Sequence, residues 1–328
     1  MVWKPKEREL TREEAIEEAK KVLAPFWYGS KPLVMASFVG KDVRIFPIDD
    51  AFSKGSWMVA LLDPFSPSGL GALRYINQMH RRHHPHDLNT CVVLRSPYEF
   101  ARDRDQLQVL LEELGISYPV VLDADGQLHR GFEVSQWEGV SYRLYHAGEC
   151  RVKADAAVVP EEWETEIQAF LRSRDPGLAV RPVLDTREFD LKVQSISVQS
   201  ALKNFRTLNV SGEWRDEGSG VFSVDPQSAL EFEIPARRAF LLVEKKGKPS
   251  TTALVKVSLA GIPVFAEDRG VSLIELDDGQ TAIHFKRARL FELLQRNDSA
   301  SGPRKLRLEA VSTDDLKIIF HRLFIEEP

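Results

Sequence analysis

The chain has 328 residues, a formal net charge of −5 and a hydrophobic content of 43%. This length predicts two domains, and the mild acidity argues against broad electrostatic binding to nucleic acid or anionic lipid. No apolar stretch approaches the roughly 20 residues that a membrane span needs, and the first residues lack the apolar core of a secretory signal. With only Cys91 and Cys150, the chain has no disulfide framework and no cysteine zinc site, so we expect a cytoplasmic protein without a membrane partner.

The first half of the chain alternates strand and helix patterns. A capping box at residues 11–14 predicts an amphipathic helix over 11–24, within an N-terminal extension spanning 1–30. Strands are expected at 33–38, 43–47, 57–62, 90–95, 119–122, 142–146 and 150–156, and further helices from 67, over 99–114 and over 160–173. This order predicts a mixed sheet covered by helices, in an α/β domain spanning 31–175.

The second half reads differently. Helical periodicity fades in a linker over 176–195, and short alternating runs separated by Gly, Pro, Asp and Asn clusters follow. The runs lie at 206–210, 229–234, 238–244, 252–259, 271–276, 281–286, 305–310 and 317–326, with one helix-like interruption at 288–294. Evenly spaced strands with turn signals predict an all-β jelly-roll or sandwich domain over 196–328.

One turn stands out. Residues 66–69 read Ser-Pro-Ser-Gly between the apolar strand 57–62 and the helix that follows. A strand, a Cys-x-x-Cys turn and a helix are how thioredoxins present their thiols, and both sulfurs are replaced here. Ser66 followed by Pro67 is also the ordinary start of a helix, an N-cap with proline at the first helical position, and we favour this structural interpretation over a nucleophilic serine.

Several stretches, taken together, resemble the redox-domain half of DipZ-type thiol–disulfide interchange proteins, relatives of the TlpA-like thioredoxins. They are Pro97–Phe100, Leu114–Asp123, Ala288–Leu294 and Lys317–Phe324. The resemblance implies a thioredoxin-like domain followed by a carbohydrate-module-like sandwich. It also places Ser66 and Gly69 at the two redox cysteines, Ala60 at a buried carboxylate and Ser141 at the cis-proline. Loss of these parts together implies that dithiol chemistry is not the task of this protein.

Other candidate sites have simpler explanations. The cluster of His80, His83, His84 and His86 could place two ligands on one helix face, but a solvated cationic helix C-terminus is favoured over a metal site. Cys91 is expected in the core, and Cys150 beside a hairpin turn. Asp123 and Asp125 suggest a turn rather than a calcium loop.

The resulting hypothesis is a redox-inactive thioredoxin-like binding or scaffold protein without cofactor or metal. By analogy with the fold, a peptide or protein partner would contact Phe65, Pro67, Trp137 and Tyr142 beside the helix start. One alternative is an enzyme with unconventional chemistry at Cys150 or at the histidine cluster, such as a single-thiol peroxidase or a relative of the thiol–disulfide oxidoreductases. Another is a carbohydrate-binding module, for which Trp214 is the only tryptophan beyond residue 190.

Overall fold

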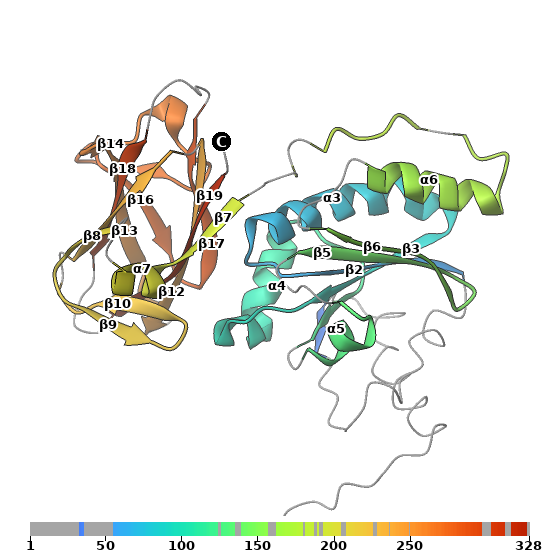
Figure 1. The fold of residues 1–328 in the computed structure, drawn as a ribbon, viewed down its shortest axis with the longest axis horizontal. Helices are drawn as coiled ribbons and strands as arrows, with labels where there is room; N and C mark the ends of the chain where they lie inside the picture. The colour runs from blue at the N-terminus through green and yellow to red at the C-terminus, as the bar shows by residue number, and fades with distance from the viewer. Residues whose placement is uncertain are drawn as a thin grey trace, which may run out of the picture. The chain divides into compact units, whose positions relative to one another are not determined.

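The structure, a computed structural model, describes fourteen segments of the chain in two compact units, residues 1–191 and 192–328 (Figure 1). The described segments are 33–35, 55–123, 126–134, 139–156, 162–179, 181–186, 189, 193–204, 208–225, 228–235, 237–248, 250–296, 303–311 and 316–326. The helix predicted over 11–24 and the strand predicted over 43–47 lie outside these residues.

The first unit is built on a mixed six-stranded sheet in the order β1-β4-β3-β2-β5-β6. Its strands are β1 (Leu33–Met35), β2 (Ser56–Leu62), β3 (Leu88–Leu94), β4 (Val120–Leu122), β5 (Val140–His146) and β6 (Glu149–Ala156). The first four strands in this order are parallel, β5 pairs antiparallel with β2, and β6 pairs antiparallel with β5. All seven residues of β2 are buried, which explains its continuous apolar sequence, since a central strand covered on both faces has no polar side.

Helices cover both faces of this sheet. They are α3 (Pro67–His83), α4 (Arg104–Glu113), α5 (Gln127–Gly131) and α6 (Glu162–Arg174), with short 3-10 turns η2 (His84–His86) and η3 (Glu99–Arg102). In Figure 1, α3 and α6 lie along one face and α5 lies on the other. The arrangement resembles the thioredoxin-like fold that the sequence predicts.

The prediction of a single helix over 99–114 is wrong in one respect. The segment divides into η3 and α4, because the side chain of Asp103 accepts hydrogen bonds from the backbone amides of Asp105 and Gln106 and so starts a new helix.

The second unit consists mostly of two antiparallel sheets. One has the order β17-β12-β19-β10-β9, with β7 beside β19, and the other the order β15-β16-β13-β18-β11-β8, with β14 beside β13. The strands are β7 (Val193–Ser197), β8 (Leu208–Ser211), β9 (Trp214–Glu217), β10 (Gly220–Ser223), β11 (Ala229–Ile234), β12 (Arg238–Gly247), β13 (Ala253–Leu259), β14 (Ile262–Pro263), β15 (Ile274–Glu275), β16 (Thr281–Phe285), β17 (Arg289–Gln295), β18 (Arg304–Val311) and β19 (Leu316–Glu326). One helix, α7 (Val198–Asn204), and a 3-10 turn, η4 (Ala266–Asp268), interrupt the described strands. Apolar side chains from both sheets form one core, which is consistent with the predicted β-sandwich.

The helix-like segment 288–294 is a strand, so that prediction is wrong. Its residues form most of β17, which pairs antiparallel with β12 from Arg238 to Val243. The five residues from Leu290 to Leu294 are buried, and a run buried on both faces reads alike as a helix or as a strand. The segment becomes a strand because it pairs with β12, which lies about 50 residues earlier in the chain.

Among the described residues, no helix is both long enough and apolar enough to cross a membrane.

Candidate functional site

The loop between β2 and α3 carries the Ser-Pro-Ser-Gly sequence, and its serine caps the helix. Ser66 has extended backbone angles, φ −105° and ψ 150°, and its Oγ accepts a hydrogen bond from the Gly69 amide at 3.0 Å. The same hydroxyl donates to the carbonyl oxygen of Asp63 at 3.0 Å and lies 3.3 Å from Ser68 Oγ. These described partners include no general base, so the hydroxyl serves the cap rather than acting as an activated nucleophile.

Gly69 leaves no room for a side chain. A Cβ atom built on Gly69 would lie 1.8 Å from the carbonyl oxygen of Asp63 and 2.7 Å from its carbonyl carbon. The conflicting atoms belong to the backbone, so a flexible side chain cannot simply swing away. The polypeptide therefore occupies the space into which a second redox cysteine would project.

The other residues expected to border the groove are buried in this structure. Phe65 is 2% exposed and packs edge-on against Phe100, with ring centroids 5.0 Å apart, and Pro67 is buried beside it. Tyr142 is 1% exposed, packs edge-on against Trp163 and donates its hydroxyl hydrogen bond to Glu166. The fourth candidate, Trp137, lies outside the described residues.

The remaining matches to the thioredoxin pattern lie on the central strands. Ser141 is 2% exposed and pairs with Leu61 of β2 and Asp155 of β6. Ala60 is fully buried in the middle of β2. Ala60 thus lies in the strand that leads to the loop, and Ser141 lies beside that strand in β5.

The two cysteines are free and separated by two strands, because Cys91 is in β3 and Cys150 in β6. Cys91 is buried, as predicted, and burial raises the pKa of its thiol to about 12. Cys150 is half-buried, and its Sγ lies 3.4 Å from the carbonyl oxygen of Val152. The raised pKa of Cys91 is the opposite of what an activated thiolate needs.

The histidine cluster at the other end of α3 differs from the predicted solvated helix end. His83 is 3% exposed, and its Nε2 donates to the Glu164 carboxylate of α6 at 3.2 Å. His84 is exposed, as expected, and its ring lies 4.9 Å from that of His80. The prediction failed for His83 because α6, 80 residues later, packs over this end of the helix. Within the described residues no group of three or more potential ligands is placed to hold a metal ion.

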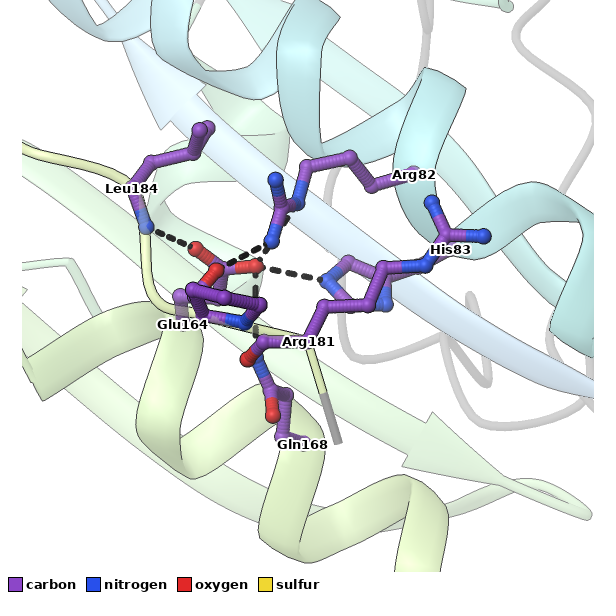
Figure 2. A network of polar contacts seen from close by, with 7 residues as sticks. Arg82, His83, Glu164, Gln168, Arg181 and Leu184 are labelled. Carbon is purple, nitrogen blue, oxygen red and sulfur yellow. Dashed lines mark hydrogen bonds and ion pairs between the residues drawn. The ribbon is translucent and has the colours of Figure 1, made fainter. Parts of the chain in front are cut away.

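Glu164 is the centre of a buried polar network (Figure 2). Its side chain has no exposed surface, and four donors converge on it. They are Arg82 Nε at 2.9 Å, His83 Nε2 at 3.2 Å, Gln168 Nε2 at 3.3 Å and the backbone amide of Leu184 at 2.6 Å. Burial alone would raise the pKa of this carboxyl, but the hydrogen bond from His83, the Leu184 amide and the charge of Arg82 outweigh it and hold the pKa below its usual value.

The network also forms hydrogen bonds with residues 181–186, a segment without regular secondary structure that we call the strap. Arg82 also donates to the carbonyl of Pro182, and Gln168 donates to the carbonyl of Arg181 at 3.0 Å. Figure 2 shows the backbone amide of Leu184, in the strap, directed at the carboxylate of Glu164 in α6.

Beyond the strap, Phe189 lies along α3. Its ring is 5.7 Å from that of Tyr75, and its backbone oxygen would lie 2.8 Å from a Cβ on Gly71. The chain after α6 thus contacts α3 from Arg82, near its C-terminus, to Gly71, in its second turn.

A buried carboxylate and a half-buried histidine make further polar contacts in the α/β unit. Asp123, at the end of β4, accepts hydrogen bonds from the Leu128 amide and from both the amide and Nδ1 of His129, the last at 2.8 Å. Burial opposes ionisation of Asp123, yet these bonds keep its pKa below the usual value. Asp123 thus orders the turn before α5, whereas Asp125 lies outside the described residues. His80 is hydrogen-bonded to Thr90 at 3.2 Å, and burial, with His84 and Arg81 nearby, lowers its pKa to about 4.

Trp214, in the second unit, packs against neighbouring residues of the sandwich. Its indole nitrogen donates to the carbonyl of Ser211, and its ring meets Phe320 edge-on at 5.4 Å.

Comparison with known proteins reveals only partial similarities. No protein-family model and no curated protein sequence matches this chain. Among solved structures, a thioredoxin-like protein in the oxidized form is 16% identical, with a TM-score of 0.34, over 37% of this chain and 80% of that one. A putative thiol:disulfide interchange protein DsbE from Chlorobium tepidum is 16% identical, with a TM-score of 0.32, over 37% of this chain and 84% of that one. A family two carbohydrate esterase from Cellvibrio japonicus is 12% identical, with a TM-score of 0.31, over 42% of this chain, which spans only 34% of the esterase.

Sequence reasoning missed Glu164, although a signal was present. In the predicted helix over 160–173, Glu164 and Gln168 lie four residues apart, next to the apolar positions Ile167 and Leu171. Polar residues within an apolar stripe have to find buried partners, so such a pair predicts a hydrogen-bond network. What the sequence could not indicate is which residues supply the donors.

Proposed function

We propose that this chain is a binding or scaffold protein whose thioredoxin-like unit does not carry out dithiol–disulfide exchange. The observation that carries the proposal is the closed loop before α3. The Asp63 carbonyl occupies the space beside Gly69, and Ser66 Oγ is bound into the helix cap. A site that lacks both thiols, and the room for one of them, retains the scaffold without the redox chemistry.

Dithiothreitol-driven reduction of insulin tests the redox part of this proposal. The wild-type protein is expected to leave the rate unchanged from that of dithiothreitol alone. Ser66→Cys/Gly69→Cys is expected to restore little activity, because the new side chain at 69 meets backbone. Acceleration by the wild type, lost in Cys150→Ser, would instead establish the alternative of single-thiol chemistry.

The proposed partner of the α/β unit is an extended peptide or protein segment that binds beside the start of α3, next to β5. The pairing of β5 with β2 begins at Ser141, so the peptide would pair with the backbone of residues 139 and 140, and such pairing supplies main-chain hydrogen bonds. Since Phe65 and Tyr142 are buried, binding requires the residues covering them to move aside.

Carboxymethylated insulin B chain serves as an extended probe for this surface. Bound probe is expected to change hydrogen exchange in residues 63–70 and 139–142. Exchange changes confined to other segments, or none at saturating probe, would contradict this location.

A further inference from the structure

Exposed apolar side chains gather in one short segment of the second unit. Six large apolar side chains are exposed among the described residues, and four of these lie between residues 262 and 274. They are Ile262, Phe265, Val271 and Ile274, with exposed fractions of 46%, 56%, 76% and 43%. Single exposed apolar residues are ordinary, but a group is typical of an interaction site. We call this group the 262–274 surface.

The fold brings the two ends of this segment together at Thr281. The backbone amide of Val264 donates to Thr281 Oγ1 at 3.0 Å, and Glu275 pairs with Thr281 where β15 meets β16. Phe265 follows Val264 and Ile274 precedes Glu275, so both lie around the same fully buried threonine. The fold therefore brings the positions of Phe265 and Ile274 close together, although they lie nine positions apart in the sequence.

The loop that presents these side chains is firmly held. The amides of Gly270 and Ser272 donate to the carbonyls of Leu293 and Glu292, at 3.0 and 3.3 Å, and Arg269 Nε donates to the carbonyl of Val264 at 2.8 Å. Gly270 packs so closely against β17 that a Cβ atom on it would lie 2.3 Å from the backbone carbonyl oxygen of Glu292. The buried residues Val264 and Leu273 anchor the same loop in the sandwich core. A pre-organised apolar surface loses little conformational entropy on binding, which favours association.

The stretch of chain that carries these apolar side chains is rich in carboxylates. Residues 262–280 contain five carboxylates and one arginine. Arg269 pairs with Glu275 at 2.7 Å, and Asp268 faces two arginines from β17–β18 at 3.7 and 3.9 Å. Glu267 and Asp277 are exposed in the same stretch of chain, and Asp278 is 3.9 Å from Lys256. Exposed carboxylates next to apolar side chains favour a partner that is both apolar and basic.

We propose that the 262–274 surface binds a basic amphipathic segment of a partner protein. Apolar side chains of the partner cover Phe265 and Val271, while its lysines or arginines face Glu267 and Asp277. The surface belongs to the sandwich unit, so this proposal goes beyond the one made for the α/β unit and does not depend on it.

A fluorescein-labelled peptide of leucine and lysine, with leucine at i, i+3 and i+4 spacing, is the probe for this surface. Anisotropy titration of the full chain is expected to show salt-sensitive binding. Phe265→Ser/Val271→Ser is expected to weaken binding at least about tenfold, as loss of central apolar contacts does. Glu267→Lys/Asp277→Lys is expected to weaken it severalfold. Val224→Ser, a change at an exposed valine outside this segment, is the matched control and should leave binding unchanged.

Three results would overturn the proposal. The first is equal binding of a peptide with glutamate in place of lysine. The second is equal weakening by Val224→Ser and by Phe265→Ser/Val271→Ser. The third is a wild-type dimer in sedimentation equilibrium that Phe265→Ser/Val271→Ser converts to monomer, which would make the surface an interface between copies. None of these results bears on the insulin reduction assay, so the two proposals can fail separately.

Discussion

Replacing Glu164 by alanine should destabilise the α/β unit more than any other single change in the network of Figure 2. The carboxylate is fully buried, and its removal takes this acceptor from His83 and the Leu184 amide, while Gln168 keeps only the carbonyl of Arg181. Removing one partner of a buried ionic network typically costs about 3–5 kcal/mol. The Arg82 side chain is 21% exposed and can regain water, so we expect the lower end, about 3 kcal/mol.

The structure also predicts how the isosteric variant behaves. Glu164→Gln keeps the shape but loses the charge, and its amide group opposes at least one of the four donors. We expect it to lose about half as much stability as Glu164→Ala, whereas the exposed Glu162→Gln should stay within about 0.5 kcal/mol of wild type. Because the pKa of Glu164 is held low in the folded protein, its contribution is complete above the unfolded value near 4.3 and disappears as pH falls through the folded value.

Calorimetry and hydrogen exchange together measure these effects. A loss of about 3 kcal/mol corresponds to a decrease of roughly 6–12 °C in the melting temperature of a unit of this size. Exchange at residues 181–186 should accelerate in Glu164→Ala well before global unfolding, because the strap loses its central acceptor. A variant within about 1 kcal/mol of wild type, or unchanged exchange in the strap, would refute the reasoning.

Three further predictions concern individual residues. Gly69→Ala should destabilise the α/β unit by about 2–3 kcal/mol in urea unfolding, because its Cβ meets the Asp63 carbonyl, and a neutral result would show that the loop yields easily. His80 has a folded pKa of about 4, below its unfolded value near 6.5, so the unfolded chain binds more protons between these values. Stability should therefore rise from pH 4 to 6.5, and His80→Gln should flatten this dependence in urea midpoints measured across the range. Native protein should react with a thiol reagent at Cys150 well before Cys91, which is buried with a raised pKa, so Cys150→Ser should remove the fast phase.

Local patterns predicted much of the α/β unit. The helix cap at Ser66 and Pro67 was readable because a cap is formed within four residues, and the structure shows the expected hydrogen bond to Gly69. The apolar run of β2 was predicted because it is short and is followed by turn residues, and the hairpin of β5 and β6 because Ala147 and Gly148 mark its turn. The segment 288–294 shows the limit of this reasoning, because an apolar run buried on both faces has no period that distinguishes a strand from a helix.

By itself, then, the sequence determined the two-part organisation into an α/β and a mostly β region, the local start of α3 and the absence of cysteines from the loop before it. Only the tertiary structure decided that the Asp63 carbonyl fills the space beside Gly69, and that Arg82 meets Glu164 across 82 residues of chain. It also decided that Phe265 and Ile274 lie around Thr281. The physical reason is the separation along the chain over which each kind of interaction acts. Caps and periodicity depend on neighbours a few residues away, whereas close backbone approach and the pairing of buried charges depend on which distant segments the fold brings into contact.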